Sequence, residues 1–332
     1  MANQAKYDVL GIGNAIVDVI APVKDAFLAD QDITKASMTL IDEARAQSLY
    51  DAFPAASETS GGSAANTIAG LASLGARTAY FGKVADDTLG KTFSHDLRAT
   101  SARFDTPPLT NGPGTARCLI AVTPDAQRSM STYLGASSLF GIGDLDEAVI
   151  KDAAITYMEG YLFDRDEAKQ AFIHAAEIAA AAGRKTALTL SDLFCVDRHR
   201  TSFLHLVRGH IDILFANEAE LLALYETDDF EAALDQVRRD CAFAAVTRSE
   251  KGSVLISADE TAHINAEPIE KIVDTTGAGD LYAAGVLYGL SRDLPLAACG
   301  RLGSVAAAEI ISHYGARARK NLQQLCGLSD NG

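Results

Sequence analysis

The chain has 332 residues, of which 48% are hydrophobic and 22% are charged, and its formal net charge at pH 7 is −15. This length and composition suit one large α/β domain with a substantial core and room for a smaller appendage. A surface this acidic repels the phosphates of nucleic acids and also repels anionic membranes. We therefore expect neither as a partner.

Short apolar runs alternate with amphipathic segments along the chain, a pattern typical of βα units around a mainly parallel sheet. We therefore predict an α/β fold in which a mainly parallel central sheet is flanked by helices. The expected elements, in chain order, are the strand Asp8–Gly11, the helix Ser63–Leu74, the strands Thr78–Gly82 and Ile155–Glu159, the helix Asp166–Ala182, the strands Thr186–Ser191 and Ile211–Ala216, the helix Glu218–Tyr225, the strands Phe243–Thr247 and Ser253–Ile256, and the helix Gly277–Leu290.

Two stretches fit this alternation less well, one from about Val17 to Leu40 and one from Ala116 to Tyr133. Both look like extended segments with polar turns, so we predict a small β-sheet that projects from the main domain as a lid. The boundaries that follow are a core of residues 1–16, 41–112 and 135–332 and a lid of residues 17–40 and 113–134.

The cysteines and the amino-terminal residues indicate the cellular compartment. The five cysteines are scattered and form no C-x-x-C pair, which argues against a disulfide framework and a structural zinc site and fits a reducing environment. The first residues show no basic region followed by an apolar run, and no stretch approaches the ~20 apolar residues needed to span a bilayer. We therefore expect a cytoplasmic protein.

Two glycine-containing runs resemble nucleotide-binding signatures but lack a required residue. The run that begins at Gly11 follows a strand, yet Ile16 stands where a dinucleotide fingerprint needs its third glycine. The run Gly90–Thr92 resembles the end of a P-loop, yet Ala85 stands where that loop needs its first glycine. We therefore expect neither a Rossmann dehydrogenase nor a P-loop ATPase.

The segment Asp274–Asp280 (DTTGAGD) is a polar, glycine-rich turn that runs into an apolar helix. Its glycines let backbone N–H groups converge, and the helix dipole adds positive potential at the same place. Such a site suits a phosphoryl group in transfer, with Asp280 placed to accept a proton from an attacking hydroxyl. The alternative is structural: Asp280 only stabilises the helix start, and the glycines only form the turn.

Three motifs together resemble those of the ribokinase-like (PfkB-type) family of carbohydrate and nucleoside kinases. The segment Asp274–Asp280 is similar to the C-terminal signature of that family, and GGSAAN at Gly61–Asn66 is similar to its N-terminal signature. NEAE at Asn217–Glu220 is similar to its N-x-x-E motif. The motifs occur in the family's order and cover nearly the whole chain. Within the family, GIGNAIVD at Gly11–Asp18 most resembles the adenosine kinases.

The resemblance implies a ribokinase-like fold and an ATP-dependent kinase that phosphorylates the primary hydroxyl of a ribose-containing molecule. Asp280 would be the catalytic base, and the amides of Gly277, Ala278 and Gly279 would form the anion hole. The residues implied to hold the acceptor sugar are Asn14, Asp18, Gly61, Gly62 and Asn66. The residues implied to lie on the nucleotide side are Asn217, Thr247, Arg248, Gly252 and Thr276, with Arg128 of the lid closing over the phosphates.

The resemblance also implies metal ions. Mg²⁺ would accompany ATP, with Glu220 holding it through water, and a monovalent cation such as K⁺ is left open at Asp274. The spacing of Asn217 and Glu220 fits a helix capping box equally well, and that role does not exclude the metal. Other polar candidates have structural alternatives as turn caps or solvated side chains, namely Asn14, Asp18, Asn66 and Arg128.

The part of the site that would hold a base departs from the adenosine kinases. Met38 stands where those enzymes tend to carry a glutamine, and Leu162 replaces part of an aromatic run. We expect an apolar slot near Met38, Leu40 and Leu162 if the acceptor is adenosine or a related nucleoside. The alternatives are a sugar kinase acting on ribose, fructose or another carbohydrate, and a non-catalytic ligand-binding relative. The sequence leaves the choice between monomer and homodimer open.

Overall fold

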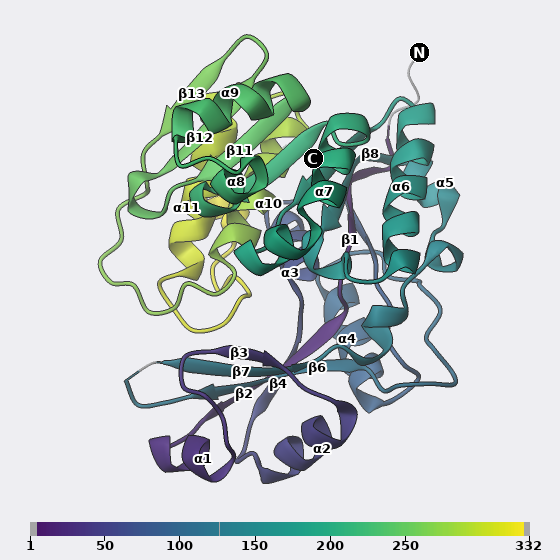
Figure 1. The fold of residues 1–332 in the computed structure, drawn as a ribbon, viewed down its shortest axis with the longest axis vertical. Helices are drawn as coiled ribbons and strands as arrows, with labels where there is room; N and C mark the ends of the chain where they lie inside the picture. Colours follow the sequence, from purple (N-terminus) through teal and green to yellow (C-terminus); the bar gives the residue numbers. More distant parts are fainter. Residues whose placement is uncertain (1–4, 126, 329–332) are drawn as a thin grey trace.

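The computed structural model describes residues 5–125 and 127–328, and this part of the chain forms two β-sheets with helices packed around them (Figure 1). The large sheet and its helices fill the upper part of that view, and the small sheet lies below them. The chain passes between the sheets where β1 (Tyr7–Ile12) leads into β2 (Ile16–Pro22), and again where β4 (Ser57–Gly61) leads into α3 (Ser63–Ser73).

The large sheet contains eight strands within the described residues, in the order β13-β12-β11-β10-β9-β8-β1-β5. The strands from β5 to β11 are parallel, and β12 and β13 add an antiparallel edge. The predicted fold class and all seven predicted strands are confirmed, whereas β13 was not predicted. Besides β1, the bounds are β5 Thr78–Phe81, β8 Ala153–Glu159, β9 Lys185–Thr189, β10 Ile213–Asn217, β11 Phe243–Thr247, β12 Ser253–Ser257 and β13 Thr261–Ile264.

Both faces of the large sheet are covered, because alternate side chains of each strand enter different cores. In β1, Val9 belongs to the core that also contains side chains of α3, α4, α10, α11 and α12, while Leu10 and Ile12 belong to the core that contains side chains of α5 to α9. Strands buried on both faces read as continuous apolar runs, which is why they could be found from the sequence. Besides α3, the bounds are α4 Thr88–Ala99, α5 Glu147–Lys151, α6 Asp166–Ala181, α7 Leu193–Gly209, α8 Glu218–Tyr225, α9 Phe230–Asp240, α10 Ala278–Leu290, α11 Leu296–Ile310 and α12 Leu322–Leu325.

The four predicted helices are confirmed as α3, α6, α8 and α10, with each end within one residue of the prediction. The longer helices α4, α7, α9 and α11 were not predicted. The rejected P-loop fragment Gly90–Thr92 lies inside α4, whose N-cap Asp87 accepts a hydrogen bond of 2.7 Å from the Gly90 amide. That fragment is therefore an ordinary capped helix start, as we expected.

The small sheet has the order β3-β7-β6-β2-β4, and both stretches predicted as extended contribute strands to it. One boundary was wrong: β4 belongs to this sheet, although we assigned residues 41–112 to the core. Its sequence, SETSG, has no apolar alternation to mark it as a strand. Helix α2 (Glu43–Ala52) also packs on this sheet. The remaining bounds are α1 Asp25–Asp30, β3 Met38–Leu40, β6 Ala116–Val122 and β7 Arg128–Tyr133.

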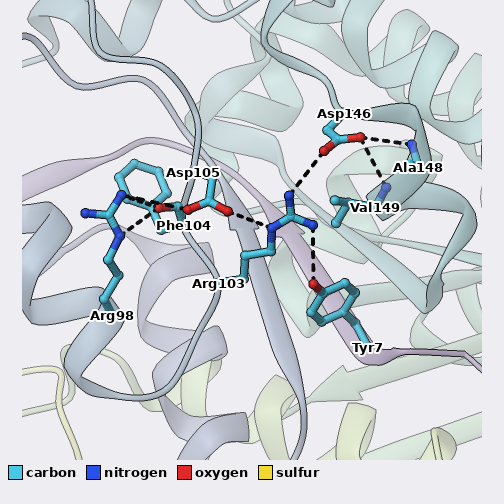
Figure 2. Close-up of polar contacts among 8 residues, drawn as sticks. All are labelled: Tyr7, Arg98, Arg103, Phe104, Asp105, Asp146, Ala148 and Val149. Atoms are coloured by element: carbon cyan, nitrogen blue, oxygen red, sulfur yellow. Dashed lines mark hydrogen bonds and ion pairs between the residues drawn. The ribbon is translucent and has the colours of Figure 1, made fainter.

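A polar network holds the amino-terminal end of β1, at the edge of the sheet away from its carboxyl ends (Figure 2). Arg103 donates hydrogen bonds to Asp105 (2.8 Å), the Tyr7 hydroxyl (3.3 Å) and Asp146 (3.3 Å). Asp146 is also the N-cap of α5. Because exposed ion pairs of this kind stabilise a protein little, the network mainly locates the loop after α4 against β1 and α5.

Within the described residues, no helix has both the length and the apolar character that crossing a membrane requires.

Candidate active site

A cavity of about 1480 Å³ lies between the two sheets, at the carboxyl ends of the large-sheet strands. Open α/β sheets generally bind ligands at this edge. The lining also includes the first turn of α10 and side chains of the small sheet. The predicted site residues that line it are Asn14, Asp18, Met38, Gly62, Asn66, Asn217, Glu220, Thr247, Gly252, Thr276, Gly277, Ala278, Gly279 and Asp280.

The turn before α10 forms one wall of the cavity. Gly277 is the N-cap of the helix with a left-handed φ of 81°, and a Cβ there would lie 2.9 Å from that of Ala316, so glycine is required. The amide of Ala278, which we predicted in the anion hole, donates instead to the Thr275 carbonyl at 3.1 Å. The first-turn amides of Gly279 and Asp280 have no acceptor within the helix, and both residues line the cavity. These two amides and the helix dipole favour an anion there.

Asp280 lies in the first turn of α10 and is oriented by the first turn of α3. Its Oδ1 accepts a hydrogen bond of 2.6 Å from the Ser63 hydroxyl, and its Oδ2 accepts one of 2.9 Å from Asn66 Nδ2. Burial raises the pKa of Asp280, while these two hydrogen bonds and the charge of Arg317 oppose the rise. A carboxylate that is fixed in place and has a raised pKa suits a general base.

Asp18 and Asn66 approach the same part of the cavity from different elements. Asp18 stands on β2 directly over Gly61, where any Cβ would collide with its carboxylate. Burial raises the pKa of Asp18 to about 6, helped by Asp280 and opposed by Arg317 and Arg128. Asn66 Oδ1 is buried and has no hydrogen-bond partner among the described residues, so it is an unused acceptor in the side chain that contacts Asp280.

Asn14 is held by a buried carboxylate that we did not predict. Its Nδ2 donates to Glu159 at 3.0 Å, and its Oδ1 accepts from the Ser137 hydroxyl at 3.0 Å. Glu159 also accepts from the Ala64 amide at 2.8 Å, which caps the start of α3. Burial raises the pKa of Glu159 to about 7. This network fixes Asn14 and the Gly62 loop relative to each other.

The apolar part of the cavity differs from the prediction at one position. Met38 and Leu40 line it, but Leu162 is only 4% exposed and packs in the core below. Its neighbour Tyr161 faces the cavity, together with Phe194, which is 76% exposed at the start of α7. Neighbouring residues in the 3₁₀ turn Gly160–Leu162 point in different directions, which the sequence pattern does not reveal.

Asn217 and Glu220 form the capping box that we considered as their structural role. Asn217 Oδ1 accepts from the Glu220 amide at 2.8 Å, and Glu220 accepts from the Asn217 amide at 2.9 Å and from Asn217 Nδ2 at 2.6 Å. Both side chains also line the cavity. Burial raises the pKa of Glu220 to about 7, with Asp192 adding to the rise.

Of three other residues predicted on the nucleotide side, two line the cavity and one does not. Thr247, at the end of β11, lines the cavity, as does Gly252. Arg248 does not. Its guanidinium donates to Glu218 at 2.9 and 3.1 Å and lies 4.0 Å over the ring of Phe230. In this conformation Arg248 is committed to a structural contact outside the cavity.

Arg128 joins the small sheet to the turn before α10. Its guanidinium forms an ion pair with Asp274 and donates to the Thr276 hydroxyl at 3.1 Å. The two paired side chains are 8% and 5% exposed, so the alternative of a solvated Arg128 is wrong. Asp274 also accepts from the amides of Thr276 (3.1 Å) and Gly315 (3.0 Å). Because the Arg128 guanidinium already places a positive charge against this carboxylate, Asp274 does not fit a monovalent cation here.

The donor set for a divalent metal is sparse. Among residues 5–125 and 127–328, no group of three or more His, Cys, Asp or Glu side chains could hold a metal ion. Mg²⁺ in phosphoryl-transfer sites usually takes one or two carboxylates, waters and substrate phosphates rather than an all-protein cage. Glu220, a single carboxylate on the nucleotide side of the cavity, fits that arrangement.

Several site residues were missed by reasoning from the sequence. Ser63 lies within the motif Gly61–Asn66, and so could have been found there. Glu159 ends a strand and Phe194 begins an unpredicted helix, so neither carried a signal. Arg317 lies in the irregular segment after α11 and donates hydrogen bonds to the carbonyls of Ser60 and Ala65, on either side of the Gly62 loop.

The chain is similar to known proteins in sequence and in fold. The family described as "pfkB family carbohydrate kinase" matches residues 31–322. The crystal structure of adenosine kinase from Sinorhizobium meliloti is 53% identical, with 96% of this chain and 98% of that one covered and a TM-score of 0.89. A probable sugar kinase protein from Rhizobium etli is 50% identical, with 98% of both chains covered and a TM-score of 0.91. "Probable fructokinase-6, chloroplastic" of Arabidopsis thaliana is 30% identical over 75% of this chain and 66% of that protein.

Proposed function

The chain belongs to the pfkB family of carbohydrate kinases, and on that basis we propose that it phosphorylates the 5′-hydroxyl of adenosine or a related nucleoside. It is a phosphotransferase with an alcohol group as acceptor, and ATP is its phosphate donor. The observation that carries the proposal is the contact between Asn66 and Asp280, which places a hydroxyl-binding amide against the carboxylate base. The 53% identity to an adenosine kinase supports the choice of acceptor.

In the proposed reaction Asp280 accepts the proton of the 5′-hydroxyl. The 5′-oxygen bonds to the γ-phosphorus of ATP, the bond from that phosphorus to the β–γ bridging oxygen breaks, and ADP leaves. The amides of Gly279 and Asp280 and the dipole of α10 stabilise the transferred group, and the Gly277 turn shapes this anion hole. Arg128 stays paired with Asp274 and donates to the Thr276 hydroxyl at 3.1 Å, so it adds a positive charge beside this anion hole.

The acceptor ribose would bind between Asp18 and Asn66. Asp18 accepts hydrogen bonds from ribose hydroxyls, and the orphan Oδ1 of Asn66 accepts another. Gly62, with φ of 97° at the N-cap of α3, has to be glycine because a Cβ there would lie 2.2 Å from the Asn14 carbonyl oxygen, so it keeps this loop against Asn14. Asn14 is oriented toward the same place by Glu159. A site built from such groups rejects analogues that lack the hydroxyls.

The base of a nucleoside would occupy the apolar slot lined by Met38, Leu40, Tyr161 and Phe194. On the donor side, Mg²⁺ supplies charge neutralisation for the phosphates when it is bound, with Glu220 and Asn217 as its protein-side partners. Thr247 and Gly252 line the donor part of the cavity. The Arg128 guanidinium takes the role at Asp274 that K⁺ would otherwise have.

We further propose that the small sheet acts as a lid, because Arg128 on β7 links it to the turn before α10. Closure would exclude water and suppress ATP hydrolysis without an acceptor. The cysteines at 118, 195, 241, 299 and 326 are free thiols, which supports a reducing, cytoplasmic location.

The alternative within the family is a sugar kinase, which the 50% identity to a probable sugar kinase favours. A free sugar would leave the slot around Tyr161 and Phe194 unfilled. A panel of adenosine, guanosine, inosine, ribose and fructose with Mg-ATP separates the two, with products identified by mass spectrometry. We expect adenosine to give the highest kcat/KM and AMP as product. Turnover of free sugars alone would establish the alternative, and no turnover at all would indicate a non-catalytic relative.

A further inference from the structure

Arg317 clamps the loop that carries the acceptor-binding residues. Its Nε and Nη2 donate to the Ser60 carbonyl at 3.1 and 2.9 Å, and Nη2 also donates to the Ser60 hydroxyl at 3.0 Å. Its Nη1 donates to the Ala65 carbonyl at 2.6 Å. Ser60 and Ala65 flank Gly61–Ser63, so one guanidinium bonds both sides of this loop.

The same segment forms the back of the anion hole. The Gly315 amide donates to Asp274 at 3.0 Å, the Ile311 carbonyl accepts from Val273 at 2.8 Å, and Ala316 lies against Gly277. Residues 311–317 therefore contact the phosphoryl side through their backbone and the acceptor side through Arg317. The two halves of the site are joined at this side chain.

Arg317 also faces both carboxylates of the acceptor site. Its charge acts to lower the pKa of Asp18 and of Asp280. The other groups that face Asp280 are Ser63, Asn66, Asp18, Tyr157, Glu159 and Tyr161. Those that face Asp18 are Arg128, Asp280 and Cys118. Arg317 is the cation acting on both carboxylates, and Tyr80 and Asp96 also face it.

We propose that Arg317 is a positioning residue for phosphoryl transfer: its guanidinium fixes the Gly61–Ser63 loop against the anion hole and brings a positive charge near Asp18 and Asp280. This inference rests on the proposed kinase function. Arginine suits the task because its planar fork can bond two carbonyls at once while carrying a permanent charge. Lysine would keep the positive charge but could not bond both carbonyls with a planar group. Glutamine would remove the positive charge.

The test compares Arg317→Lys, Arg317→Gln and wild type in kcat/KM for the acceptor between pH 5.5 and 9. Loss of the charge should move the acidic limb of the Arg317→Gln profile upward by about one pH unit. Arg317→Lys should keep the limb in place and lower kcat by about tenfold through misplacement of the loop. Arg319→Gln is the matched control, because Arg319 is exposed in the same segment and donates to the Tyr314 carbonyl.

A cavity of about 400 Å³ behind Arg317, lined also by Ser60, Asn66 and Asp96, offers a rescue experiment. Added guanidinium should enter this cavity and restore part of the activity of Arg317→Ala, but not of Asp280→Asn. Thermal unfolding of each variant shows whether it folds.

A second measurement does not require turnover. Carbon-13 NMR titration of the Asp18 and Asp280 carboxyl groups should show both pKa values rising in Arg317→Gln and unchanged in Arg319→Gln. An unchanged titration and an unmoved acidic limb would overturn the role of Arg317. If wild type phosphorylates no acceptor, the proposed function fails, and the titration still decides this inference.

Discussion

Asn66 Nδ2 donates a hydrogen bond of 2.9 Å to Asp280 Oδ2, and this bond joins α3 to α10 across 214 residues of sequence. Asn66 belongs to the first glycine motif and Asp280 to the last, so the contact unites the acceptor and phosphoryl halves of the site. Because Asn66 Oδ1 has no other partner among the described residues, we expect one amide to orient both the base and the ribose whose 5′-hydroxyl the base deprotonates.

Replacing Asn66 by alanine should weaken turnover more than replacing Ser63. Each variant removes one hydrogen bond to Asp280, but Asn66→Ala also removes the acceptor for a ribose hydroxyl. Hydrogen bonds to charged groups contribute about 1.5–3 kcal/mol, so kcat/KM should fall by roughly 10- to 100-fold per bond. In steady-state kinetics with adenosine, kcat/KM should therefore be lower for Asn66→Ala than for Ser63→Ala. The reverse order would mean that Asn66 does not contact the acceptor.

Tyr161 and Leu162 are neighbours with opposite surroundings, which makes them a matched pair. Tyr161→Ala should raise the KM for adenosine by roughly 10-fold while the protein keeps its stability, because the ring lines the slot for the base. Leu162→Ala should instead lower the free energy of unfolding by about 2–5 kcal/mol, because Leu162 is buried. Michaelis constants and urea unfolding of both variants give the comparison. An unchanged KM in Tyr161→Ala would remove Tyr161 from the nucleoside slot.

Glu159 should make stability fall as the pH rises. Burial raises its pKa from 4.5 to about 7, so the folded state binds more protons than the unfolded chain between these values. Stability conferred by the protonated form is present below about pH 4.5 and is lost as the pH rises through 7. Between pH 5 and pH 8 the free energy of unfolding should therefore fall less in Glu159→Gln than in wild type, by up to about 3 kcal/mol. Urea unfolding at the two pH values measures this difference. If the free energy of unfolding falls equally in both proteins, the pKa of Glu159 is not raised in the folded state.

Activity should not depend on potassium, because the Arg128 guanidinium pairs with Asp274 where a monovalent cation would bind. Replacing K⁺ by tetramethylammonium at constant ionic strength should leave kcat within twofold. Sodium serves as the control for a general salt effect. Strong activation by K⁺ alone would show that Arg128 leaves Asp274 and that the cation takes its place.

The sequence pattern revealed the parallel strands because their residues are apolar on both faces, and it revealed Asp280 because glycine-rich helix starts are recognisable. It failed where a residue's surroundings depend on distant elements. The polar β4 pairs with β2 without any apolar signal. Arg317 and Glu159 acquire their roles through contacts with α3, far away in sequence. The orientation of Leu162 depends on one 3₁₀ turn.

The most direct test of the account is a single comparison: formation of adenosine 5′-phosphate from adenosine and Mg-ATP by wild type and by Asp280→Asn. A positioned general base contributes about 10²- to 10⁴-fold, so kcat of Asp280→Asn should fall by that factor while ATP still raises the melting temperature of the variant. Chromatographic quantification of AMP gives both rates. If Asp280→Asn forms AMP as fast as wild type, Asp280 is not the base and the central claim is wrong.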